Sequence, residues 1–428
     1  MKPQLPAPLF QRISCLCPLV ETAYQIAQDH PMMESMTGKV TPRPSSDPGP
    51  SPPWRVPTAV YVHIPFCRHH CHYCDFAIAT GKNHLKDRYL DAVEAEFTRL
   101  GESRPVETWF WGGGTPSELS PEQILRLCQI MRRWVPLNPG GEFSLEVNPD
   151  DCDPARLAAM AEGGVTRVSI GVQSFHNATL EFLERRHDPT QVASAVALAR
   201  QSGIANISLD LIFGSPGQSL ELWKRDLQSA LEFQPNHFST YGLTYEKGTP
   251  LWKRMTKGDF LPLADDQELS RYELAIDLLE QAGFEHYEVS NFAKPGRRCK
   301  HNEVYWANHA YFGAGMGAAR YVNGKREVNT RDLDAYLRKS LAGEETAFQS
   351  ESLSPLEEAK ETLGLNLRRQ AGARRAEFLQ RTGLHLEEIV GSKAEPLVEK
   401  GLLIQDMQGV RLTRQGRYLF DWVIGRLF

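Results

Sequence analysis

Three cysteines lie close together in the stretch HIPFCRHHCHYCDF, where Cys67, Cys71 and Cys74 follow the spacing C-x3-C-x2-C. Thiolates bind zinc and iron–sulfur clusters, and this spacing in a chain with only eight cysteines is a strong indication of metal binding. Eight cysteines in 428 residues are too few for a disulfide scaffold. The thiols therefore indicate a reducing compartment, and we expect a cytoplasmic protein.

Two kinds of metal centre fit these thiolates. A structural zinc site takes four ligands, so a Cys₃His site would need a nearby histidine such as His63, His69, His70 or His72. A [4Fe–4S] cluster on three thiolates leaves one iron open to an outside ligand. We favour the cluster, because only three thiolates are local and the sequence has no second C-x-x-C pair. The loop also follows a predicted strand, and barrel enzymes place their chemistry at strand ends. A zinc-stabilised interaction protein is the alternative.

Alternating strands and helices are expected to position this loop. We predict strands at 59–64, 107–111, 142–147, 167–172, 206–212 and 237–241, and helices at 84–100, 121–134, 154–162, 176–202, 219–233 and 265–282. Six strand–helix units predict an α/β fold with a parallel sheet and crossover helices. An incomplete, TIM-like (β/α)6 barrel and an open doubly wound sheet both have this alternation.

The regions on either side of these units differ from them. Residues 1–57 end in a Pro-rich stretch and are predicted to be a disordered extension, followed by the barrel at 58–300. Residues 301–354 are predicted to form a connecting segment that carries the HNxxYW motif. Residues 355–428 predict a winged-helix-like C-terminal domain, with helices at 355–366, 372–381 and 385–400 and a hairpin at 402–413. We expect this domain to serve packing or partner docking.

Composition excludes several classes of protein. The chain is 41% hydrophobic and 24% charged, which is ordinary for a globular protein and excludes a fully disordered or collagen-like chain. A net charge of −5 gives no electrostatic reason to expect nucleic acid as a partner. The sequence contains no apolar run long enough for a transmembrane segment, so we expect a soluble protein, which is compatible with transient contact with a membrane protein.

The motifs together resemble a known superfamily. C-x3-C-x2-C after a first strand resembles the signature of radical S-adenosylmethionine (SAM) proteins, whose fold is a partial (β/α)6 barrel. The resemblance runs from about residue 59 to the C-terminus. It implies that the chain belongs to the branch of the superfamily that contains oxygen-independent coproporphyrinogen III oxidases and heme chaperones. Its motifs are YVHIPFC (61–67), GGGTP (112–116), SLEVNP (144–149), SIGVQSF (169–175), LDLIFGSPGQ (209–218) and HNEVYW (301–306).

The resemblance implies a set of cofactor contacts. In this superfamily the amino and carboxylate groups of SAM bind the fourth iron of the [4Fe–4S] cluster, here expected on Cys67, Cys71 and Cys74. Asp210 lies in an apolar strand, where a charge is costly unless it is paired or bound to a ligand. An ion pair between Arg185 and Asp210 is the structural alternative. The residues that the resemblance implies as SAM contacts are Tyr61, Tyr73, Gly113, Gly114, Thr115, Glu146, Gln173, Arg185 and Asp210.

Two further features bear on function. His301, followed by Tyr305 and Trp306, could supply an imidazole and aromatic walls to heme, and the resemblance makes it the heme candidate; an ordinary core histidine is the alternative. The oxidase pattern continues with a further cysteine, C-x3-C-x2-C-x-C, whereas here Phe76 stands in that position. Phenylalanine has no thiol for redox or proton transfer, so this substitution favours the chaperone branch.

The leading hypothesis from the sequence is a heme chaperone that carries a [4Fe–4S] cluster and an exchangeable SAM and passes heme to an acceptor protein. The alternative is a radical SAM enzyme of the oxygen-independent coproporphyrinogen III oxidase type, in which reductive cleavage of SAM yields a hydrogen-abstracting radical. The sequence leaves open whether the protein is an enzyme, and it identifies no catalytic residue.

Overall fold

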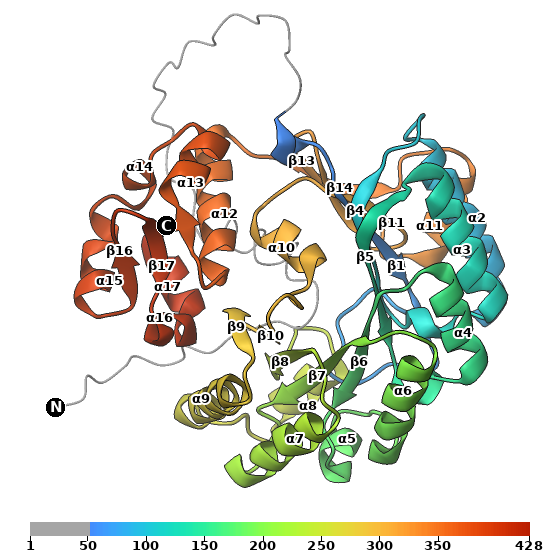
Figure 1. The fold of residues 1–428 in the computed structure, drawn as a ribbon, viewed down its shortest axis with the longest axis horizontal. Helices are drawn as coiled ribbons and strands as arrows, with labels where there is room; N and C mark the ends of the chain where they lie inside the picture. Colours follow the sequence, from blue (N-terminus) through green and yellow to red (C-terminus); the bar gives the residue numbers. More distant parts are fainter. Residues whose placement is uncertain (1–51) are drawn as a thin grey trace, which may run out of the picture.

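The computed structural model describes residues 52–428 (Figure 1). Residues 1–51, and with them most of the extension predicted over 1–57, lie outside the described residues. Of the last six residues of that extension, Pro53–Arg55 form the 3-10 turn η1. The Arg55 guanidinium donates a hydrogen bond to Glu358 at 2.7 Å, so this end of the predicted extension is ordered and packs against the C-terminal region.

A nine-stranded sheet forms the centre of the molecule, in the order β11-β1-β4-β5-β6-β7-β8-β10-β9. Its strands from β11 through β8 are parallel, and β10 and β9 add an antiparallel edge. The six predicted strands correspond to β1 and to β4 through β8. The bounds are β1 Ala59–Ile64, β4 Val106–Gly113, β5 Leu137–Val147, β6 Arg167–Gln173, β7 Asn206–Phe213, β8 His237–Gly242, β9 Glu285–Glu288, β10 Asn291–Ala293 and β11 Phe312–Ala314.

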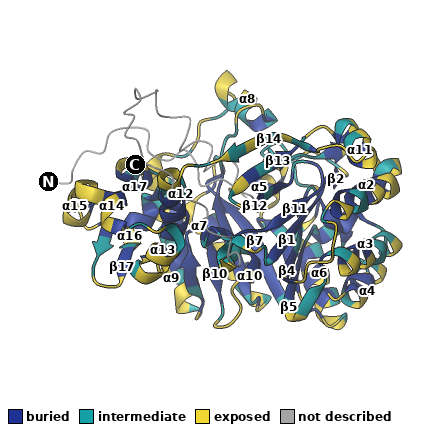
Figure 2. Ribbon diagram, turned by 90° about the horizontal axis from the view of Figure 1, so that it is seen from above, coloured by how far each residue is buried: buried dark blue, intermediate teal, exposed yellow. Residues whose placement is uncertain are grey.

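Helices connect successive parallel strands and cover the outside of the sheet, which makes the fold a partial (β/α)6 barrel (Figure 1). Buried strands line its interior, whereas the outer faces of the helices are exposed (Figure 2). The helices are α2 Lys86–Thr98, α3 Pro121–Trp134, α4 Pro154–Gly163, α5 Asn177–Phe182, α6 Pro189–Gln201, α7 Leu220–Glu232, α8 Pro250–Lys257 and α9 Asp265–Gln281.

The single helix predicted over 176–202 was wrong, because it is divided into α5 and α6. Pro189 begins α6, and the Asp188 side chain forms a capping box with Gln191 that defines a new helix start. The residues between the two helices form a loop at the rim of the barrel. This loop carries Arg185 and His187 into the candidate site.

The barrel sheet extends beyond the boundary predicted at residue 300. Strand β11 pairs in parallel with β1, with Val60 opposite Phe312, so the segment predicted as a connection contributes a strand to the sheet. The same segment contains a small antiparallel sheet in the order β12-β13-β14. Its elements are α10 Lys300–Trp306, β12 Ala319–Val322, β13 Lys325–Asn329, α11 Leu333–Leu341 and β14 Ala347–Ser352.

Residues 355–428 form a mainly helical unit with a core of its own and a three-stranded sheet in the order β15-β17-β16. Its first helix starts at a capping box between Ser354 and Glu357. The helix predicted over 385–400 is interrupted at Gly391, which adopts a positive φ of 49°. The elements are α12 Pro355–Arg368, β15 Ala373–Arg374, α13 Arg375–Thr382, α14 Leu386–Val390, α15 Glu395–Glu399, β16 Leu403–Gln405, β17 Gly409–Leu412, α16 Arg414–Tyr418 and α17 Phe420–Leu427.

Buried ion pairs join this unit to the rest of the chain. Arg326 on β13 lies 3.1 Å from Glu361 on α12, and their side chains are only 7% and 6% exposed. Asn308 donates a hydrogen bond to the same carboxylate at 3.0 Å.

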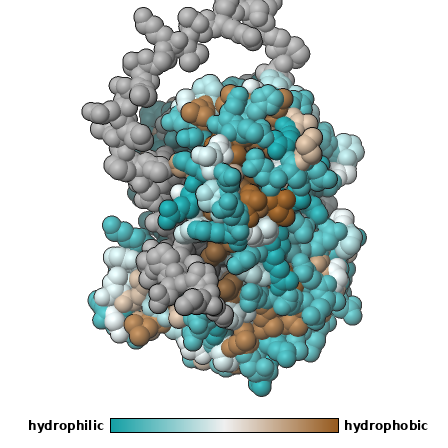
Figure 3. All heavy atoms as spheres, turned by 90° about the vertical axis from the view of Figure 1, so that its left-hand side faces the viewer, coloured by the Kyte–Doolittle hydropathy of each residue, from teal (hydrophilic) through white to brown (hydrophobic). Residues whose placement is uncertain are grey.

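The visible outer surface on this side is mostly hydrophilic, with apolar patches between polar areas (Figure 3). In the part of the chain that the structure describes, no helix has both the length and the apolar character that a membrane crossing requires.

Candidate functional site

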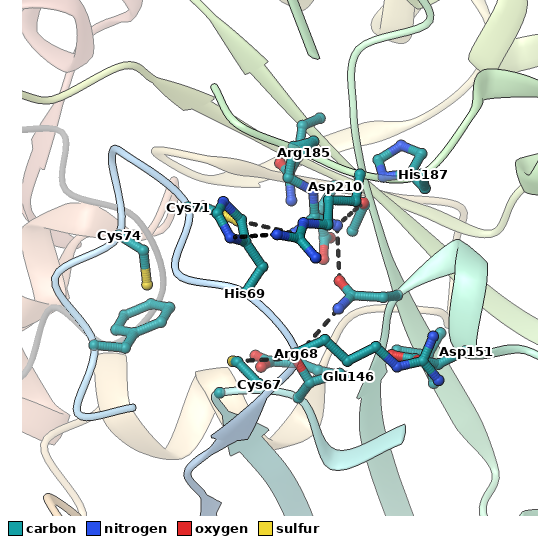
Figure 4. A pocket seen from close by; sticks show the side chains of 18 of the residues that line it. Cys67, Arg68, His69, Cys71, Cys74, Glu146, Asp151, Arg185, His187 and Asp210 are labelled. Atoms are coloured by element: carbon teal, nitrogen blue, oxygen red, sulfur yellow. Dashed lines mark hydrogen bonds and ion pairs between the residues drawn. The ribbon is translucent and has the colours of Figure 1, made fainter. Parts of the chain in front are cut away.

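A pocket lies where the parallel strands of the barrel end, beside the cysteine loop (Figure 4). It encloses about 1040 Å³, including space open to solvent. All three motif cysteines line it, and so do eight of the nine predicted SAM contacts: Tyr73, Gly113, Gly114, Thr115, Glu146, Gln173, Arg185 and Asp210. Segments far apart in the sequence therefore meet at one place.

The cysteine loop begins and ends in two short parallel strands, β2 (Phe66–Cys67) and β3 (Ala79–Thr80). Cys67 Sγ lies 3.3 Å from Thr115 Oγ1, and the Arg185 guanidinium donates to Cys71 Sγ at 3.9 Å. Burial raises the pKa of the Cys67 and Cys74 thiols to about 12. A metal centre with net positive charge would offset this effect of burial, because thiolates bound to a metal are deprotonated.

Charged residues fix the start of the loop to the barrel. Arg68 lies 2.7 Å from Asp151 and also forms an ion pair with Glu118. The Lys86 ammonium lies 3.0 Å from the same Glu118 carboxylate, which is buried. Because the acidic partners belong to turns that follow β4 and β5, this network sets where the first cysteine stands relative to the strand ends.

The glycines of GGGTP leave room where no side chain fits. Gly113 has φ +111°, and a Cβ there would lie 2.5 Å from the imidazole ring of His63. A Cβ on Gly114 would lie 2.5 Å from the carbonyl oxygen of Pro65 and 3.0 Å from Cys67 Sγ. The backbone of this turn therefore comes close to the cysteine loop, an approach that a larger residue would prevent.

Two acidic side chains line the pocket, Glu146 on β5, which is partly buried, and Asp210 on β7, which is buried. Glu146 accepts a hydrogen bond from the backbone N–H of Gly113 at 3.2 Å, and burial together with nearby Asp210 raises its pKa to about 8. Asp210 accepts from the hydroxyl of Ser169 at 2.9 Å, and burial raises its pKa as well. Such carboxyl groups favour a ligand that brings positive charge or hydroxyl donors.

Arg185 does not form the ion pair with Asp210 that the sequence left open. Its guanidinium donates instead to the Asn148 side chain and to the Gly171 carbonyl, at 2.7 Å each. Arg185 therefore presents a partly buried positive charge beside Cys71. Gln173 ends β6 with φ 64°, a conformation that costs on the order of 1–3 kcal/mol and is found at functional sites.

Two predicted site residues lie elsewhere. Tyr61 is on β1, where its hydroxyl lies 3.0 Å from His63 Nδ1 and its ring stacks on Phe110, and it does not line the pocket. His301 is fully buried on α10, with Nδ1 2.8 Å from Thr108 Oγ1 and Nε2 2.8 Å from the Tyr305 hydroxyl.

His301 thus lies beside the start of β4, away from the strand ends that carry the pocket. Its two ring nitrogens are both engaged, so in this arrangement neither is free to ligate a heme iron.

Asn148 is a pocket residue that the sequence analysis missed. It bridges two predicted contacts, because it accepts from Arg185 and donates to Thr115 Oγ1 at 3.2 Å. Ser169, which holds Asp210, was also missed. Both lie in the quoted motifs SLEVNP and SIGVQSF: Asn148 directly follows β5, which was an available signal, whereas Ser169 lies within β6.

The donor set fits a cluster and SAM. Three thiols from one loop line the pocket, a partly buried arginine suits a carboxylate, and two acidic side chains suit a cation and hydroxyl groups. Over residues 52–428, no three His, Cys, Asp or Glu side chains gather closely enough to hold a single metal ion.

Comparisons with known proteins agree with this site. Residues 61–230 match the Radical SAM superfamily, and residues 353–419 match the HemN C-terminal domain. Coproporphyrinogen III oxidase (HemN) from Escherichia coli has a similar structure, with a TM-score of 0.77 and 24% identity over 87% of this chain and 90% of that one. Fold and site thus define a radical SAM protein.

Two relatives give the closer assignment. Heme chaperone HemW of Bacillus subtilis is 38% identical over 371 residues, which cover 86% of this chain and 98% of that protein. The mitochondrial radical S-adenosyl methionine domain-containing protein 1 of Mus musculus is 33% identical over 93% of this chain and 91% of that one. The chain belongs to the HemW family of the radical SAM superfamily, and this membership implies a [4Fe–4S] cluster and SAM.

Proposed function

We propose that this protein is a heme chaperone, which binds heme and transfers it to an acceptor protein. The observation that carries the proposal is Phe76, which lines the pocket two residues after the last cysteine of the motif. The oxidase pattern has a thiol at this position, and a phenyl ring cannot transfer a proton or an electron as a thiol does. The relatives named heme chaperone match nearly the full length of the described chain.

Cys67, Cys71 and Cys74 would hold the [4Fe–4S] cluster, and an exchangeable SAM would occupy the remainder of the pocket. When bound, these groups supply one-electron chemistry at an iron with an open position. Arg185 would pair with the SAM carboxylate, and the peptide groups of Gly113 and Gly114 would lie along its methionine end. In the chaperone, this pair of cofactors would serve structure or regulation.

The carboxyl groups of the pocket would select a cationic ligand. The pKa values of Glu146 and Asp210 are both raised, because burial removes water from the charged form of each carboxyl group. A sulfonium or ammonium group beside them would favour their ionised forms and thereby bind more tightly. Tyr73, Thr115 and Gln173 would complete the contacts.

The heme site is separate from the cofactor pocket in this proposal. His301 is satisfied by Thr108 and Tyr305, so its place in the structure supports a structural role for the HNxxYW motif in closing the bottom of the barrel. A different residue would then ligate the iron. The heme acceptor would be a protein, and the thiolate centre would require a reducing compartment such as the cytoplasm.

The test combines two assays on anaerobically reconstituted protein. Titration with heme, followed by absorbance, should show stoichiometric uptake, and heme should then move to an added apo-hemoprotein. Incubation with coproporphyrinogen III, SAM and a reductant should give no protoporphyrinogen. Robust formation of protoporphyrinogen, or failure to bind heme, would overturn the proposal, and zinc in place of iron and sulfide would favour an interaction protein.

A further inference from the structure

The segment Asp75–Ala77, directly after the third cysteine, is held by residues outside the pocket. The guanidinium of Arg331 donates to the Asp75 carbonyl oxygen and lies 3.5 Å from the Asp75 carboxylate. His63 Nε2 lies 2.7 Å from the Ala77 carbonyl oxygen. Both ends of the segment are therefore attached, and Phe76 lies between them.

A close backbone approach adds a third contact. Gly317 lies in the turn between β11 and β12 with φ +72°, and a Cβ there would lie 2.5 Å from the Ala77 Cβ. The turn is tied to the end of β13, because the Gly317 N–H donates to the Thr330 carbonyl at 2.9 Å. The methyl group of Ala77 thus packs against the bare Cα of Gly317, and only glycine leaves space for it.

The turn is itself anchored on a buried carboxylate. Glu96 on α2 accepts hydrogen bonds from the Gly315 N–H at 2.9 Å and from the Asn329 and Tyr336 side chains at 2.7 Å each. Asn329 also donates to the Gly315 carbonyl at 2.8 Å. Because these donors come from three separate elements, the turn is held in place and cannot easily move away from Ala77 when a side chain is added at Gly317.

The held segment touches the third cysteine directly. Phe76 stands two residues after Cys74, and the side chains of both residues line the pocket. The solvent exposure and the surroundings of the sulfur ligands help to set the reduction potential of an iron–sulfur cluster. Moving the segment would therefore change the environment of one cluster ligand without removing any ligand.

We propose that Gly317 and Arg331 are positioning residues for the cluster: they hold Asp75–Ala77 and thereby keep Phe76 in its place at the pocket wall near Cys74. Both residues lie outside residues 61–230, which match the superfamily, and neither lines the pocket. The inference rests on the proposed function only in taking Cys74 as a cluster ligand.

The test measures the midpoint potential of the reconstituted cluster in the full chain by a redox titration followed by electron paramagnetic resonance. Gly317→Ala should shift the potential away from the wild-type value, since the added methyl group displaces Ala77 and with it Phe76 beside the cluster ligands. Gly343→Ala is the matched control, because Gly343 has a similar φ of +71° and nothing lies within 4 Å of an added Cβ. Its potential should equal that of the wild type.

A second substitution separates the contact from general damage. Ala77→Gly removes the methyl group that the new Cβ meets, so Gly317→Ala combined with Ala77→Gly should return the potential toward the wild-type value. Arg331→Met should shift the potential in the same direction as Gly317→Ala, whereas substitution of the exposed Arg338 on α11, Arg338→Met, should not.

The positioning role is overturned if Gly317→Ala leaves the potential equal to that of Gly343→Ala, or if Ala77→Gly fails to reverse the shift. A wild-type chain without inorganic sulfide would overturn the cofactor assignment as well. A wild-type cluster that responds to SAM, with unchanged potentials in the variants, overturns the positioning role alone.

Discussion

The partly buried carboxyl group of Glu146 should make the cluster-free chain lose stability as pH rises. Folding raises its pKa from 4.5 to about 8, mainly because burial removes water from the charged form. Below pH 4.5 both folded and unfolded chains hold the proton, so the group has no effect there. Between these values only the folded chain holds it, and stability is lost progressively up to about pH 8.

The size of the effect follows from linkage. For this pKa pair the loss between pH 6 and pH 8 is about 2 kcal/mol, or roughly one eighth to two fifths of the stability of an ordinary domain, about 5–15 kcal/mol. Glu146→Gln keeps the shape of the side chain and removes the titration. The difference in unfolding free energy between wild type and variant should therefore change by about 2 kcal/mol over this pH range.

The assay is denaturant unfolding of both chains, without iron, sulfide or SAM, at pH 6, 7 and 8. Comparing the two chains at each pH cancels the contribution of the buried histidines, which titrate in both. Glu122→Gln is the control, because Glu122 is an exposed carboxylate on α3 and its removal should leave the pH dependence unchanged. A Glu146→Gln variant with the same pH dependence as the wild type would refute the reasoning.

Three further predictions follow from the same contacts. His301→Ala should lower the unfolding free energy by about 1–3 kcal/mol, because the buried hydroxyl groups of Thr108 and Tyr305 lose a hydrogen-bond partner. Heme titration of this variant should show unchanged affinity. A loss of heme affinity with unchanged stability would restore His301 as a heme ligand. Arg326→Leu should lower the unfolding free energy, measured by chemical denaturation, by about 3–5 kcal/mol, because the buried Glu361 carboxylate loses its positively charged partner. A change near zero would contradict the proposed role of this ion pair in attaching the C-terminal unit. Phe76→Cys should keep its iron and sulfide yet produce no protoporphyrinogen from coproporphyrinogen III, and gain of that product would show that one thiol separates the two functions.

The sequence predicted the core of the fold because its signals are local. Six apolar strands alternate with helices whose starts are marked by residues such as Ser120 and Pro121, and both kinds of pattern depend only on neighbours in the chain. The division of 176–202 was missed, although Asp188-Pro189 is itself a helix-start signal. Strand β11 was missed because its pairing with β1 joins residues about 250 positions apart, and no local pattern records such a contact.

The pocket was predicted largely because its residues lie in short motifs at strand ends. Eight of the nine residues predicted as SAM contacts line it, and Tyr61 does not, because its side chain contacts His63 and Phe110 inside the barrel. The heme expectation at His301 could not be judged from sequence, since burial and the partners Thr108 and Tyr305 appear only in the folded chain.

The central claim is that three thiolates hold an iron–sulfur cluster with one iron left open for SAM. The most direct test is the iron, inorganic sulfide and zinc content of anaerobically purified protein, with Cys71→Ser as the comparison. The account predicts about four iron and four sulfide per chain in the wild type, as a [4Fe–4S] cluster requires, and loss of the cluster in the folded variant. One zinc per chain without sulfide, or a full cluster in Cys71→Ser, would contradict it.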